Sequence, residues 1–212
     1  MNASLRTLVT ALLLTALSFA ALLETEPSVG IVRDEGIYMA ASRRYGAWVE
    51  GVRTGDVAIT DRAQRDRAFR VNAEHPALMK IVAGLTAEYL APSQAQAAVA
   101  GSSTPLREST TYRIPAMVIA SLGVGLLYLL GVQLAAPIAA LLAACGFLLL
   151  PRVFFHAHLH CFDVPVAIWI LAVAACWFRA GTSRLAGASA GLALGLAVAT
   201  KHNALFMLPL VL

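Results

Sequence analysis

The chain has 212 residues, of which 59% are hydrophobic and 13% are charged. Soluble domains carry about 25% charged residues, so this composition excludes an ordinary water-soluble domain and indicates a chain solvated mainly by lipid. Eleven of the twelve acidic residues lie between Glu24 and Glu108, within one polar insert. The net charge is +4, but the basic residues form no separate patch and no nucleic-acid-binding motif occurs. Nucleic acid is therefore not expected as a partner.

The first apolar segment covers residues 5–23, which is long enough to cross a bilayer. A cleaved signal peptide is the alternative, because Ser18-Phe19-Ala20 supplies small residues near the end of the segment. The apolar core is long for a signal peptide and more apolar segments follow, which favours a retained membrane anchor.

The polar insert covers residues 24–112 and is predicted to be a long first loop outside the cytoplasm. Apolar and aromatic residues recur at helical spacing over residues 34–52, as in a helix that lies at the membrane surface. A second amphipathic helix is predicted over residues 77–90. The loop is therefore expected to bear interfacial helices.

Further apolar segments follow the insert and predict an all-α, polytopic transmembrane helix bundle that forms one domain. The chain ends within an apolar run, so we expect these residues to be the N-terminal part of a longer protein. The predicted spans after the first are residues 114–130, 134–150, 164–178 and 185–199, with an incomplete one at 204–212.

The orientation follows from the short loop of residues 179–184, which carries two arginines and no acid and is therefore placed in the cytoplasm with the N-terminus. Alternating crossings then bring four polar segments to the outer face: residues 34–35, 74–80, 156–163 and 201–203. Ionisable residues in such a chain often mark a functional site. We expect a pocket at the outer membrane interface.

The acidic pair Asp34-Glu35 follows the first span by about ten residues. A carboxylate there can act as a general base on an acceptor hydroxyl or amine, or it can bind a divalent cation. The alternative is a helix N-cap with an acidic first turn.

The segment from Glu74 to Lys80 contains His75-Pro76, and the proline favours an extended residue before it and a helix start after it. A helix N-terminus binds anions, and Lys80 adds a cation one turn later. Together they could hold a lipid-linked phosphate. The alternative is an ordinary helix start with a lysine that reaches to the interface.

Three histidines alternate at His156, His158 and His160. In an extended segment they would share a face, as metal ligands do. On a helix they would scatter, and no cysteine or carboxylate pattern completes a metal site. This favours ordinary histidines at the membrane interface.

Asp163 is the only acid after the insert and precedes an apolar run. A carboxylate at this boundary is costly unless it is paired or solvated, so it either caps a helix or binds a substrate or cation. Lys201 lies between the last two apolar segments, where it either reaches to the interface or pairs with a phosphate or carboxylate.

Five short motifs occur in a fixed order and on one predicted side of the membrane. The chain thereby resembles the GT-C membrane glycosyltransferases, in the branch of protein O-mannosyltransferases and lipid A aminoarabinose transferases. One departure is Ala77, where that family has a second proline. The motifs are Asp34-Glu35-Gly36-Ile37-Tyr38, Glu74-His75-Pro76-Ala77-Leu78-Met79-Lys80, Tyr112-Arg113-Ile114-Pro115-Ala116, Phe162-Asp163-Val164-Pro165-Val166 and Ala199-Thr200-Lys201.

The resemblance implies an inverting transfer of a sugar from a polyprenyl-phosphate donor to a protein or lipid acceptor outside the cytoplasm. It implies that Asp34 is the base, that Lys80 holds the donor phosphate and that Arg113 orients the first loop. Glu35 and Lys201 join the expected donor or pocket residues, together with Glu74, His75 and Asp163, which are expected to line the pocket. A divalent metal is compatible with these residues but not required by them.

The resemblance places the protein in a membrane, expected to be the bacterial inner membrane, with its site on the extracytoplasmic face. One alternative is a transporter component, which would carry polar groups or broken helices near the middle of the bilayer. The other is a non-catalytic membrane subunit, which would not bring Asp34, Lys80 and Asp163 together.

Overall fold

The computed structural model describes residues 2–56, 61–91, 107–181 and 183–211, and this part of the chain is helical without strands. This confirms the predicted all-α bundle. The helices are α1 (Ala3–Thr25), α2 (Glu35–Thr54), α3 (Arg62–Ala68), α4 (Leu78–Leu90), α6 (Glu108–Leu134), α7 (Pro137–Leu149), α8 (Pro151–His158), α9 (Asp163–Ala180), α10 (Arg184–Thr200) and α11 (Leu208–Val211), with short 3-10 helices at Glu26–Ser28 and His202–Met207.

Among the described residues, three helices are long and apolar enough to cross a membrane: Ala3–Ser28, α6 and α9. Helices α7 and α8 meet at a bend of 63° and give a fourth crossing if they act as one broken span. Large apolar side chains such as Leu12 and Leu17 point outward from α1 and are 60% and 66% exposed. Such a surface suits a chain that is surrounded by lipid.

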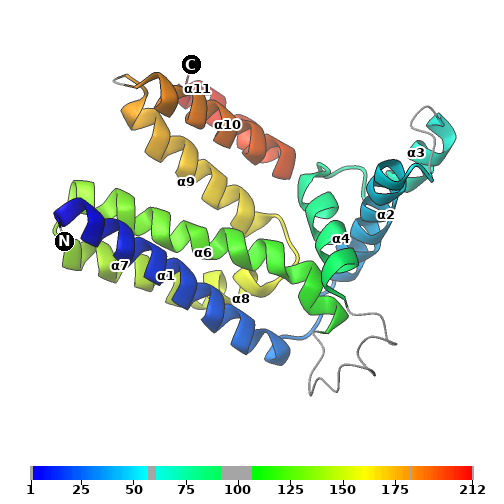
Figure 1. Ribbon diagram of the computed structural model, residues 1–212, viewed down its shortest axis with the longest axis horizontal. Coiled ribbons are helices and arrows are strands. Elements are labelled where there is room, and N and C mark those ends of the chain that lie inside the picture. Colours follow the sequence, from blue (N-terminus) through cyan, green and yellow to red (C-terminus); the bar gives the residue numbers. More distant parts are fainter. Residues whose placement is uncertain (1, 57–60, 92–106, 182, 212) are drawn as a thin grey trace.

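Helix α6 lies at the centre of the bundle, where it packs against α1, α7 and α9 (Figure 1). The core between them is built from small and medium-sized apolar residues, including Met117, Ala120, Ala144 and Ile168. Small residues let helix backbones approach closely, which is the main way that helices associate in lipid.

Helix α6 begins six residues before the span predicted at 114–130. Its first turns carry Thr110, Thr111 and Arg113, and all three are buried although they are polar. A span predicted from hydropathy begins only after these polar residues. The helix itself begins earlier, because the insert covers the polar residues and supplies their hydrogen-bond partners.

Helices α2 and α4 of the insert form a closely packed pair, and Figure 1 shows α2, α3 and α4 gathered to one side of the long helices. Their bounds agree with the two amphipathic helices expected in this loop. The backbones touch where they cross: a Cβ atom on Gly84 would lie 2.0 Å from the Ser42 carbonyl oxygen, and one on Gly46 would lie 2.6 Å from the Gly84 carbonyl carbon. Helix α4 in turn packs against α6, so the insert is fixed to the bundle.

We expect Gly84→Ala to destabilise the protein by about 1–3 kcal/mol, because the added methyl group cannot fit against the α2 backbone. Thermal unfolding of the purified protein in detergent measures this. The matched control is Gly146→Ala in α7, where a Cβ atom meets nothing within 4 Å. Equal unfolding temperatures for the two variants would show that α2 and α4 do not cross at Gly84.

Candidate functional site

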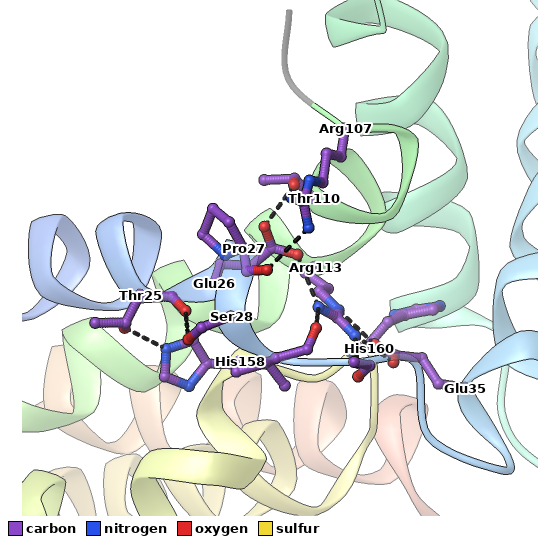
Figure 2. Close-up of polar contacts among 12 residues, drawn as sticks. Thr25, Glu26, Pro27, Ser28, Glu35, Arg107, Thr110, Arg113, His158 and His160 are labelled. Atoms are coloured by element: carbon purple, nitrogen blue, oxygen red, sulfur yellow. Dashed lines mark hydrogen bonds and ion pairs between the residues drawn. The ribbon is translucent and has the colours of Figure 1, made fainter. Parts of the chain in front are cut away.

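The guanidinium of Arg113 is buried near the start of α6 and donates all five of its N–H groups (Figure 2). Its Nε and Nη2 atoms bind the two carboxylate oxygens of Glu35, at 2.8 and 2.6 Å. Nη1 binds Glu26 at 2.7 Å, and the remaining N–H groups bind the carbonyl oxygens of Val29 and Gly30, both at 2.9 Å. This geometry satisfies a buried charge completely.

Glu26 and Glu35 are each 1% exposed, so the cluster holds two carboxylates and one guanidinium away from water. Neutral donors stabilise the excess negative charge: the Thr110 hydroxyl binds Glu26 at 2.6 Å, and the backbone N–H of His160 binds Glu35 at 2.8 Å. The cluster therefore ties together the end of α1, the start of α2, the start of α6 and the loop before α9.

Arg113 thus binds residues of the first loop on both sides of the turn before α2. The sequence reasoning named Arg113 and Glu35 but missed Glu26. An acid within three residues of an apolar span is costly unless it is paired, and this signal could have identified it.

The alternating histidines form separate anchors. His158 forms a hydrogen bond of 2.7 Å with the Thr25 hydroxyl at the end of α1. His160 forms one of the same length with the Ser42 hydroxyl in α2. The α8 helix ends at His158, so the alternation continues in the extended loop and sends the two rings to different helices. Within the described ranges, no group of three or more His, Cys, Asp or Glu side chains is placed to hold a metal ion.

Tyr38, on the second turn of α2, lies where several predicted site segments meet. Its ring centroid is 5.9 Å from that of His75 and 4.5 Å from that of Phe162. Burial raises the pKa of the Tyr38 phenol, and the negative charges of Asp34, Asp163 and Glu74 raise it further. These three acids come from separate segments of the sequence, and the charge of each acts on the same phenol.

Asp34 stands at the N-cap position of α2, but its side chain makes no capping hydrogen bond. The residue is exposed, and its carboxylate has no hydrogen-bond or ion-pair partner in the part of the chain that the structure describes. Both carboxylate oxygens of its neighbour Glu35 accept hydrogen bonds from Arg113. Of this acidic pair, Asp34 is therefore the carboxylate that can accept a proton from a ligand.

Asp163 opens α9 and forms an ion pair with Lys201, which follows α10; the two side-chain atoms are 2.5 Å apart. Their side chains are 60% and 28% exposed. Lys201 therefore pairs with a carboxylate, one of the two partners expected from the sequence. The pair links α9 and α10 at the end of the bundle that carries Tyr38.

Lys80 lies in α4 and is 0% exposed. Its ammonium group donates to the carbonyl oxygens of Asn72 at 2.6 Å and His75 at 2.8 Å, and it lies 4.7 Å from the centre of the Tyr45 ring. Burial lowers the pKa of Lys80 to about 8. In this geometry Lys80 holds the loop that carries Glu74 and His75, and its contact with a donor phosphate stays a prediction.

The fold and the site define a polytopic membrane protein with carboxylates gathered at one end of its helices. The family model for dolichyl-phosphate-mannose-protein mannosyltransferases matches residues 63–212. The chain belongs to this family, which makes it a glycosyltransferase of the mannosyltransferase kind. No curated protein and no solved structure gives a significant match. The family match begins after Asp34, so the role of this residue rests on geometry.

Replacing Arg113 by Met should destabilise the protein by about 3–5 kcal/mol, because it leaves two buried carboxylates without a counter-charge. Thermal unfolding should show part of this loss restored when Glu26→Gln and Glu35→Gln are added. Arg43→Met removes the exposed ion pair with Glu108 and should cost less than about 1 kcal/mol. Similar losses for Arg113→Met and Arg43→Met would contradict the buried cluster.

The stability of the protein should also depend on His160. Burial lowers the pKa of its imidazole from 6.5 to about 4, so between these values the unfolded chain binds a proton that the folded chain does not. Stability therefore declines as the pH falls through this window. His160→Gln removes the titrating group, so its unfolding temperature should decline less between pH 6.5 and 4 than that of the parent. If the unfolding temperatures of the parent and of His160→Gln declined equally, the pH dependence would come from carboxylates that both proteins contain.

Proposed function

We propose that this protein transfers a sugar from a polyprenyl-phosphate donor to a protein or lipid acceptor, with Asp34 as the general base. The observation that carries the proposal is the exposed carboxylate of Asp34, which has no partner among the described residues and lies beside Tyr38, where Glu74 and Asp163 also act on the phenol. Several carboxylates around an aromatic ring can accept hydrogen bonds from sugar hydroxyls. Membership in a mannosyltransferase family supports the same chemistry.

In the proposed reaction, Asp34 removes a proton from the acceptor hydroxyl or amine as that group attacks the anomeric carbon of the sugar. The new bond forms on one face while the bond from the anomeric carbon to the phosphate oxygen breaks on the other, so the configuration inverts. The electron pair leaves with the lipid phosphate. Negative charge grows on this phosphate in the transition state, and a nearby cation would stabilise it.

We place this site on the extracytoplasmic face of the bacterial inner membrane. The arrangement of the helices supports the proposal, because α1 begins and α6 and α9 end at one end of the bundle (Figure 1). The short loop with Arg179 and Arg184 lies at that end, as expected for a cytoplasmic loop. Asp34, Glu74 and Asp163 belong to the other end.

Removal of the base tests the proposal in membranes that contain the full-length protein and polyprenyl-phosphate sugars. Asp34→Asn should lower the rate of sugar transfer by about 10²-fold or more, with unchanged membrane insertion and unfolding temperature. Asp66→Asn is the matched control, because Asp66 is an exposed acid of the same insert that pairs with Arg65.

Undiminished transfer by Asp34→Asn would remove Asp34 from the mechanism. Absence of transfer by the parent with every donor tested would favour a transporter component or a non-catalytic subunit over the proposed enzyme.

A further inference from the structure

A cavity of 410 Å³ lies between α2 and α3 of the polar insert. This volume falls within the range of about 300–1,000 Å³ that is typical of small-ligand sites. The cavity shares no lining residue with the candidate site around Tyr38. Two arginines line it together with small, polar and aromatic side chains: Arg44, Ala47, Trp48, Gln64, Arg67 and Ala68.

Aromatic side chains hold the two walls of this cavity together. The Tyr45 hydroxyl of α2 shares its hydrogen bond between the carbonyl oxygens of Phe69 and Val71, which follow α3, and each oxygen lies 3.0 Å away. The Phe69 ring packs against the rings of Tyr45 and Trp48, with centroid distances of 4.3 and 5.3 Å. The walls are therefore fixed before any ligand arrives, which lowers the free-energy cost of binding.

Both arginines of the cavity lack an acidic partner. All twelve acids of the sequence lie in the described ranges, and none of them forms an ion pair with Arg44 or Arg67. Neither guanidinium has another polar partner within those ranges. Arg43, the neighbour of Arg44, differs because it pairs with Glu108. Helices α2 and α3 thus bring two exposed, unpaired positive charges to one cavity.

This arrangement suits an anion that lies between the two helices. Like charges that share a cavity repel each other, and a negative group between them reverses the sign of the interaction. A guanidinium binds a carboxylate through two parallel N–H groups. The small side chains of Ala47 and Ala68 leave room beside the arginines for the apolar stem of such a ligand.

The place of the cavity favours a ligand that comes from water. Helix α4 packs against α6, α2 packs against α4, and α3 packs against α2. Figure 1 accordingly shows α3 on the far side of α2 from the long helices. A lipid headgroup stays near the ends of the long helices, whereas an acidic segment of a protein can approach α3 from the aqueous side.

We propose that the cavity between α2 and α3 binds an acidic segment of another protein, whose carboxylates contact Arg44 and Arg67. The insert thereby acts as a docking surface on its side of the membrane. The proposal is independent of the proposed sugar transfer, because it uses none of the residues assigned to that reaction.

Binding of a model acidic peptide tests this surface. The full-length protein in phosphatidylcholine nanodiscs is titrated with a fluorescent peptide in which two adjacent glutamates are flanked by glycine and serine. Arg44→Gln and Arg67→Gln should each weaken binding about fivefold, since each removes an exposed ion pair. Added salt should weaken binding by the parent. Ala47→Phe should weaken it as well, because the larger side chain fills the cavity without a change of charge.

Two matched variants and a second peptide serve as controls. Arg33→Gln removes an exposed arginine of the same insert, and Ala63→Phe enlarges an exposed alanine of α3; neither residue lines the cavity. Both variants should bind the peptide as the parent does, and a peptide with glutamines in place of the glutamates should bind much more weakly. An equal loss in Arg33→Gln and Arg44→Gln would overturn the proposal, because the attraction would then depend on net charge alone.

Unchanged binding by Arg44→Gln and Arg67→Gln, or equal binding of the two peptides, would also overturn it. So would competition by phosphatidylglycerol that Arg44→Gln abolishes, because a lipid headgroup would then occupy the cavity. Sugar transfer is measured separately. A parent that binds the peptide through Arg44 but transfers no sugar would contradict the proposed function and support the docking surface, and transfer without such binding would do the reverse.

Discussion

The buried guanidinium of Arg113 is the interaction on which the arrangement of the site depends. A buried charge without partners costs several kcal/mol, so the chain must bring enough acceptors to it from outside α6. It does so with the carboxylates of Glu26 and Glu35 and the carbonyl groups of Val29 and Gly30. These acceptors lie at the end of α1 and around the start of α2. The path of the chain out of the membrane is thus fixed by one side chain.

This constraint places two adjacent acids in opposite environments. Glu35 binds Arg113 with both oxygens and also accepts the backbone N–H of His160, so it is an anchor whose oxygens are already bound. Asp34, one residue earlier, is carried to the surface without a partner among the described residues. A carboxylate whose two oxygens already accept hydrogen bonds has little capacity left for a ligand, whereas an exposed one can still accept them. The same turn of α2 therefore holds one carboxylate that is bound by Arg113 and one that is open to a ligand.

The sequence predicts the helices well because lipid imposes a strong pattern on them: a span must be apolar over about 20 residues. The residues that contact the Tyr38 ring, His75, His160 and Phe162, lie in segments that the sequence reading assigns to one face. Pair contacts are not encoded in that pattern. Arg113 and Glu35 are 78 positions apart, and nothing in the residues near Lys80 shows that the carbonyl groups of Asn72 and His75 turn toward its ammonium group. Asn72 does so with a positive φ of 54°.

The distribution of bound and free cations also bears on the proposed transfer, in which negative charge on a departing phosphate must be stabilised. Lys80 is held by carbonyl groups, Lys201 by Asp163 and Arg113 by two carboxylates. Moving any of these toward a phosphate would leave a buried or paired acceptor without its partner, which costs free energy at the moment when the transition state needs stabilisation. A cation without a protein partner avoids this cost. Arg152 meets that condition, since it is exposed and forms no ion pair within the described residues, so the cations that anchor the fold and a cation that is open to a ligand are different residues.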